Sequence, residues 1–165
     1  MAVPQIIRPI ALAKHTDKIG HLAIAVRNLE SSIEWYTKVL AFAVTERRTI
    51  DGKSTGMMSA VLQAGALTIV LLEGTHPESQ VSQFIDRYRP GVQHVAVRVA
   101  DIAAAIHDLR AARLEFDTPV VGGTDLKQAF SRRSEDSGLM LEIIERNTDG
   151  FAAQNVSELF RVHES

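Results

Sequence analysis

The chain has 165 residues, no cysteine and a formal net charge of −2, with 45% hydrophobic and 23% charged residues. This length and composition are typical of one compact domain, or of two small fused modules, with an apolar core. The balance of charge does not favour a partner such as nucleic acid or an anionic membrane. The lack of cysteine excludes disulfides, a thiolate nucleophile and cysteine metal ligands, and is compatible with a cytoplasmic protein.

The N-terminal segment, residues 1–18, is expected to be an arm that packs on the domain or on a partner subunit. Its apolar stretch from Ile6 to Ala13 is interrupted by Arg8 and Pro9. It is therefore too short and too broken for a membrane span or a signal peptide.

A strand that carries one inward histidine is the first element expected after this arm. In the segment 19–26, Leu22 and Ile24 share one face, while His21 lies on the other face beside alanines. A helix with Asn28 as its N-cap follows. The rest of the module is predicted to contain three strands, at 42–49, 57–63 and 67–72.

The second half of the chain repeats this pattern. Strand 91–99 places His94 opposite a row of valines, and Asp101 is the N-cap of a helix over 102–113. Further strands are expected before Gly122-Gly123, at 127–132 and at 139–145, with a connecting helix that begins at Pro77. An internal repeat of this kind fixes the architecture.

The fold class predicted is therefore α+β, with two βαβββ modules that together form a curled barrel. The expected segments are an arm at 1–18, a first module at 19–75, a connecting helix at 76–90, a second module at 91–146, and a tail at 147–165 that is helical from Asn155.

Glu142 is a third unusual residue, because it lies in the middle of the apolar strand Leu139 to Ile144. A buried acid is costly unless it is paired, protonated or bound to a metal. Two first strands and one last strand can direct side chains into one cavity, so His21, His94 and Glu142 are predicted to form a metal site. Two histidines and one carboxylate, with open positions, are typical of a non-haem Fe(II) oxygenase.

The alternative for each histidine alone is an ordinary core or rim residue, but the matched positions in the repeat favour ligands. Three further histidines, His15, His76 and His107, are expected to be solvated. Glu145 is expected to face away from Glu142, because side chains alternate along a strand.

These residues resemble the vicinal-oxygen-chelate (glyoxalase/bleomycin-resistance) superfamily. The second half is most similar to the catalytic domain of the 4-hydroxyphenylpyruvate dioxygenase family, through four motifs: Gly91-Val92-Gln93-His94, Gln128-Ala129-Phe130, Leu141 to Arg146, and Gly150 to Asn155. The resemblance implies that Gln128, Phe130 and Phe151 line the substrate pocket and that the last helix gates it.

The departures from this family are informative. The family enzyme is longer, with an additional domain that holds no metal, and this sequence matches its catalytic part. Polar positions of the family that contact substrate correspond to Ala25, Val70 and Leu72, which implies a less polar substrate. Val70 also occupies the place where the isomerases of the superfamily have a fourth ligand, so the resemblance favours oxygen chemistry.

The leading hypothesis is a cytoplasmic Fe(II)-dependent dioxygenase that oxidatively decarboxylates a 2-oxo acid with O2. The second is an isomerase or epimerase that uses another divalent metal (Co, Ni, Zn or Mn), and the third is a ligand-sequestering resistance protein on the same fold. The resemblance is also compatible with a homodimer.

Overall fold

A computed structural model describes residues 12–51 and 56–147 of the chain. Its elements, in chain order, are β1 (Thr16–Ala25), α1 (Leu29–Leu40), β2 (Ala43–Asp51), β3 (Gly56–Ala64), β4 (Leu67–Gly74), α2 (Gln80–Tyr88), β5 (Gly91–Val99), α3 (Ile102–Ala111), β6 (Val121–Gly122), β7 (Leu126–Phe130) and β8 (Met140–Arg146). Within the described ranges, no helix is long and apolar enough to cross a membrane.

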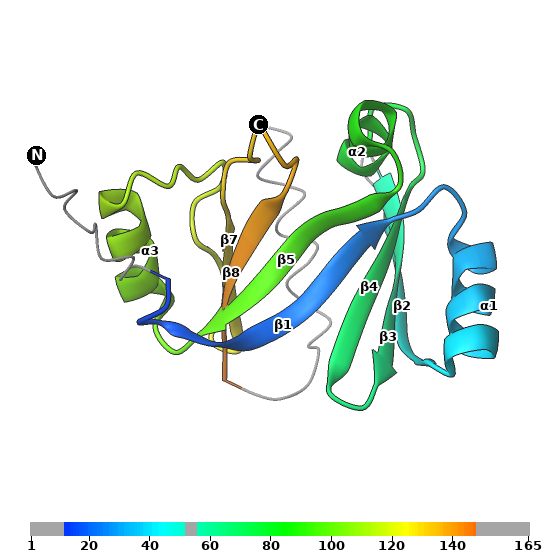
Figure 1. Ribbon diagram of the computed structural model, residues 1–165, viewed down its shortest axis with the longest axis horizontal. Coiled ribbons are helices and arrows are strands. Elements are labelled where there is room, and N and C mark those ends of the chain that lie inside the picture. The colour runs from blue at the N-terminus through cyan, green and yellow to red at the C-terminus, as the bar shows by residue number, and fades with distance from the viewer. Residues whose placement is uncertain (1–11, 52–55, 148–165) are drawn as a thin grey trace, which may run out of the picture.

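The strands form one eight-stranded mixed sheet in the order β2-β3-β4-β1-β5-β8-β7-β6. β1 and β5 are antiparallel neighbours at its centre, and each lies parallel to the last strand of its own module, β4 or β8. Figure 1 shows that the sheet curls on both sides of this central pair, with α1 and α3 on the outside at opposite ends. The predicted α+β fold of two βαβββ modules is confirmed.

Side-chain alternation along the central strands separates the core from the cavity. Ile24 on β1 packs in a cluster with α1, and Val97 on β5 packs in a cluster with α3, so these residues form the outer face. His21, Ala23 and their neighbours at every second position form the other face, which is called the inner face below. α1 and α3 thus bury the outer face, and the inner face is left for a site.

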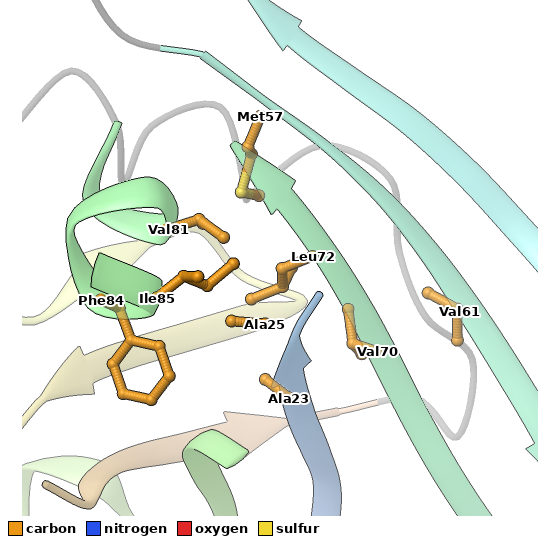
Figure 2. Packing of buried hydrophobic residues seen from close by; sticks show 9 residues of the cluster. All are labelled: Ala23, Ala25, Met57, Val61, Val70, Leu72, Val81, Phe84 and Ile85. Carbon is orange, nitrogen blue, oxygen red and sulfur yellow. The ribbon is translucent and has the colours of Figure 1, made fainter. Parts of the chain in front are cut away.

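α2 connects the first module to the second, and it covers part of the inner face of the first module. Its apolar residues point toward β1 and β4, as Figure 2 shows for Val81 and Ile85 beside Leu72 and Ala25. The helix was expected to start at Pro77 but begins at Gln80. The reason is that the hydroxyl of Ser79 accepts a hydrogen bond from the backbone N–H of Val81 and so caps the helix there.

Other boundaries also differ from the sequence prediction, and β1 begins at Thr16, within the segment expected to be the arm. α3 ends at Ala111, because Arg113 adopts a left-handed backbone with φ of 70°. The strand before Gly122-Gly123 is reduced to the two residues of β6. The helix expected from Asn155 lies outside the described residues.

His15 is also placed differently from the prediction. It was expected in solvent, but its Nε2 lies 2.9 Å from Oδ2 of Asp108 on α3, and its side chain is 11% exposed. Leu12 packs against the cluster beneath the same helix. The described end of the N-terminal arm is therefore held on α3.

The repeat extends to the way each outer helix is capped. The predicted caps Asn28 and Asp101 each accept a hydrogen bond from a backbone N–H of the first turn. In addition, the first backbone N–H of each helix donates to a glutamate on the last strand of the same module. Leu29 N donates to Glu73 at 2.6 Å, and Ile102 N donates to Glu145 at 2.8 Å.

Glu145→Gln is expected to lower the free energy of unfolding by about 1 to 2 kcal/mol, because a charge-assisted bond to a helix N-terminus is lost. The N–H of Ile102, and then Lys127, hold the pKa of the Glu145 carboxyl below its ordinary value. A lowered pKa in the folded state means that the stabilisation is present at neutral pH and lost as the pH falls below about 4. Urea unfolding at several pH values measures the difference between the two proteins. A difference that stays constant across this range would contradict the assignment.

Candidate metal centre

Three buried side chains from adjacent strands converge on the inner face. His21 is on β1, His94 on β5 and Glu142 on β8, and the sheet order places these strands side by side. Oε2 of Glu142 lies 3.1 Å from Nε2 of His21 and 3.4 Å from Nε2 of His94. The three residues are 7%, 8% and 4% exposed, respectively.

The geometry of this group fits a divalent metal ion. Candidate ligand atoms of His21, His94 and Glu142 all lie within 4.8 Å of one another. Two ligands about 2.1 Å from an octahedral metal, at right angles to each other, are roughly 3 Å apart. The observed contacts are close to that spacing, so the group could hold a metal, and no further protein ligand joins it within the described ranges.

The protonation states also suit metal binding. Burial opposes ionisation of Glu142, but the charges and hydrogen bonds of His21 and His94 outweigh it and keep the pKa of this carboxyl well below its ordinary value. Burial lowers the pKa of His94 against the opposing effect of Glu142. A carboxylate and a neutral imidazole are the forms that bind metals.

Neighbouring side chains orient His94. Nδ1 of its ring is hydrogen-bonded to Oε1 of Gln93, which leaves Nε2 directed at Glu142. The ring of Phe130 also contacts the imidazole edge-on, with centroids 5.2 Å apart. An outer-shell acceptor of this kind fixes the tautomer and direction of a metal-binding histidine.

Val70 is the counterpart of Glu142 in the repeat. Val70 on β4 pairs with Ala23, two residues after His21, and Glu142 on β8 pairs with Ala96, two residues after His94. The two positions are therefore equivalent in register. The first module contributes one potential ligand to the site and the second contributes two.

A cavity of about 520 Å³ opens over this group. Its walls combine apolar side chains from β3, β4 and α2 with a few buried polar groups and several arginines. The apolar lining includes Met57, Val61, Val70, Leu72, Phe84 and Phe130. His21, His94 and Glu142 all line the same cavity.

The residues expected to contact substrate are partly placed by the structure. Gln128 and Phe130, on β7, are buried and line the cavity. Phe151 lies outside the described residues. Gln128 and Phe130 therefore line the same cavity as the three potential ligands.

The sequence patterns do not indicate some of the residues that line the cavity. α2 contributes Val81 and Phe84, although its sequence predicts only a helix that connects the two modules. Arg48 on β2 and Arg146 at the end of β8 also line the cavity. Arg48 pairs with Ser59, whose side chain faces the cavity. This pairing could identify Arg48 as a cavity residue only if the strand register were known, and the register is a long-range property.

Comparison with known proteins gives the family. Residues 18–143 match the family model described as Glyoxalase/Bleomycin resistance protein/Dioxygenase superfamily. The chain belongs to this superfamily. The description of this superfamily names proteins with different activities. The relatives of this chain also fall into more than one group.

Among the relatives, a 4-hydroxyphenylpyruvate dioxygenase from Pseudomonas aeruginosa is 28% identical over 148 residues, covering 76% of this chain and 42% of that protein. A mitochondrial methylmalonyl-CoA epimerase from Mus musculus is 24% identical over 129 residues, covering 76% of this chain and 71% of that protein. The chain thus spans less than half of the first relative and most of the second.

Solved structures show the same two groups. A mutant 4-hydroxymandelate synthase from Streptomyces coelicolor has a TM-score of 0.75 and 24% identity, covering 87% of this chain and 51% of that one. A methylmalonyl-CoA epimerase from Streptomyces coelicolor has a TM-score of 0.69 and 24% identity, covering 81% of this chain and 96% of that one. These likenesses establish the fold, and the activity has to be argued from the site.

Proposed function

We propose that this protein is an Fe(II)-dependent dioxygenase that oxidatively decarboxylates a 2-oxo acid. The observation that carries the proposal is the set of two histidines and one carboxylate, with valine at the position equivalent to Glu142. Three protein ligands leave about half of an octahedral coordination sphere for substrate and O2. When bound, Fe(II) supplies the Lewis acidity that polarises the keto group and the redox chemistry that reduces O2.

The protein's own residues hold and shield the reacting groups. Gln93 fixes the direction of the His94 ring, and Phe130 packs edge-on against that ring. The apolar walls formed by Val61, Val70 and Leu72 keep water away from the reacting centre. The buried amide of Gln128 supplies a polar group that can orient the substrate.

A divalent-metal-dependent epimerase or isomerase is the second candidate, because the chain covers most of the length of its epimerase relatives. That chemistry needs a carboxylate or amide near the metal to move a proton. The acidic residues lining the described part of the cavity are Asp117, Glu135 and Glu142. Asp117 pairs with Arg132, and Glu142 belongs to the metal group, which leaves Glu135 and amides such as that of Gln128 to move a proton. The preference for oxygen chemistry therefore depends on valine at position 70.

Oxygen consumption tests the proposal directly. Protein purified without oxygen is loaded with Fe(II) and mixed with a panel of alkyl and aryl 2-oxo acids, and O2 uptake and CO2 release are recorded together. We expect the two to be coupled in equal amounts for at least one acid. Metal-dependent exchange of substrate hydrogen with D2O, without O2 uptake, would instead establish the epimerase reading. Ligand binding that needs no metal would point to a sequestering protein.

A further inference from the structure

Arg48 is a largely buried cation whose hydrogen-bonding capacity is mostly unused. Its side chain is 13% exposed and lines the cavity, and its Nε contacts the carboxylate of Glu46. Both terminal nitrogens are buried and have no hydrogen-bond partner in the part of the chain that the structure describes. A guanidinium offers five N–H donors, so Glu46 satisfies only one edge of it.

Leaving such donors unmatched is unfavourable. A buried donor without an acceptor costs about 1 to 3 kcal/mol, and more when the group is charged. Proteins retain a group of this kind where an anion supplies the missing acceptors, because the planar fork of arginine matches a carboxylate through two parallel bonds. Arg48 therefore has the chemistry of an anion-binding residue.

The curl of the sheet gives Arg48 a second cation as a neighbour. β2 is separated from β8 by four strands in the sheet order, yet Arg48 lines the same cavity as Arg146 at the end of β8, and its charge acts on Arg146. Burial, and then the charges of Arg98 and Arg48, lower the pKa of Arg146 against the opposing effect of Glu142. This end of the cavity, defined by Arg48 and Arg146, is called the arginine end.

The arginine end is displaced from the metal centre along β8. Glu142, Ile144 and Arg146 follow one another on the inner face, and four residues of a strand span about 13 Å between α-carbons. Val61 and Val70 line the cavity on the β2 side of the sheet, between Arg48 and His21 in sheet order. A ligand chelated at the metal centre would cross apolar walls before it meets Arg48.

We propose that Arg48 binds a second carboxylate of the substrate, which makes the substrate a 2-oxo diacid. This inference rests on the proposed function and names its substrate class. The proposed diacid modifies the expectation of a less polar substrate, which was based on the apolar residues Ala25, Val70 and Leu72. Those residues make the middle of the substrate apolar, whereas the arginine end takes an acidic group.

Anaerobic calorimetric titration of the Fe(II)-loaded protein tests this inference by binding alone. The probes are 2-oxoglutarate and 2-oxoadipate, compared with 2-oxopentanoate and 2-oxohexanoate, which have the same chain lengths and lack the second carboxylate. We expect the better diacid to bind about tenfold to a hundredfold more tightly than its monoacid, which is the range of a charge-assisted hydrogen bond.

Arg48→Gln is expected to bring the diacid and monoacid affinities within about threefold of each other. The matched control is Arg47→Gln, which removes the same charge from the neighbouring position of β2, where the side chain is exposed and paired with Glu30. It should retain the preference. If Arg48→Gln does not fold, Arg48→Lys is measured instead. Lysine keeps the positive charge but lacks the planar guanidinium, so the preference for the diacid over the monoacid should be at least threefold smaller than in wild type.

The inference is wrong if diacids and monoacids bind the wild type equally, if neither binds, or if the preference survives in the Arg48 variants. It is also wrong if Arg48→Gln weakens both acids alike, since Arg48 would then contact the chelating carboxylate. Oxygen uptake is measured separately. A diacid preference without oxygen uptake supports the role of Arg48 and removes the dioxygenase proposal. Uptake with monoacids and no diacid preference removes only the role of Arg48.

Discussion

Glu142→Gln is expected to weaken Fe(II) binding by more than about a hundredfold and to abolish oxygen uptake. The lower bound follows because loss of even an outer-shell partner of a metal ligand costs about tenfold to a hundredfold in affinity. Glutamine keeps the size of the side chain but cannot carry the negative charge that both histidines face. His94→Ala should have a similar effect, because it removes a ligand nitrogen.

Metal content after anaerobic reconstitution, together with Co(II) titration followed by visible absorption, measures this effect. Glu145→Gln is the matched control, because Glu145 lies on the same strand but caps α3 on the outer face. It should bind metal normally in spite of its lower stability. His107→Ala, an exposed residue of α3, is a control for the loss of an imidazole. A folded Glu142→Gln protein with wild-type metal affinity would show that this group is not the metal centre.

The features predicted correctly from the sequence depend on local periodicity and on the repeat. His21 and His94 could be placed on the inner face because alternation along each strand is a local property. Glu142 stood out because an acid in an apolar strand needs a partner. The repeat also predicts that strands far apart in the sequence lie side by side, because equivalent strands of two modules occupy equivalent places in the fold.

The features that the sequence does not predict depend either on competition between two local helix-start signals or on the curvature of the whole sheet. Pro77 and Ser79 are both suitable at a helix start, and the hydroxyl of Ser79 determines where α2 begins. Arg48 lies in a strand whose neighbouring Arg47 is exposed, and sequence alone does not say which of the two faces the cavity. That choice depends on how far the sheet curls, which is set by the packing of the whole molecule.

Val70→Glu is expected to convert the site from three protein ligands to four. The register makes position 70 equivalent to Glu142, so a carboxylate there would point at the same centre from the opposite strand of the repeat. A fourth ligand occupies a position that substrate or O2 needs. We therefore expect tighter metal binding and a fall in oxygen uptake of at least about a hundredfold, which corresponds to an increase of about 3 kcal/mol in the activation barrier.

Stability measurements separate metal ligation from simple disruption. Val70 is buried, so a carboxylate in its place should lower the free energy of unfolding of the metal-free protein by several kcal/mol, on the order of the cost of an unpaired buried charge. Added metal should restore this loss, because the ion binds the folded state and pairs the new charge. The melting temperature should therefore rise more on metal addition in Val70→Glu than in wild type.

Val61→Glu is the matched control, because Val61 pairs with Val70 on the adjacent strand and lines the same cavity. It carries the same cost of burial but stands one strand farther from the ligands, so added metal should restore little of its stability. Val70→Leu adds bulk without a ligand atom and should leave metal affinity unchanged. If Val70→Glu responds to metal no more than Val61→Glu, position 70 does not face the metal, and the absence of a fourth ligand there no longer favours oxygen chemistry over epimerisation.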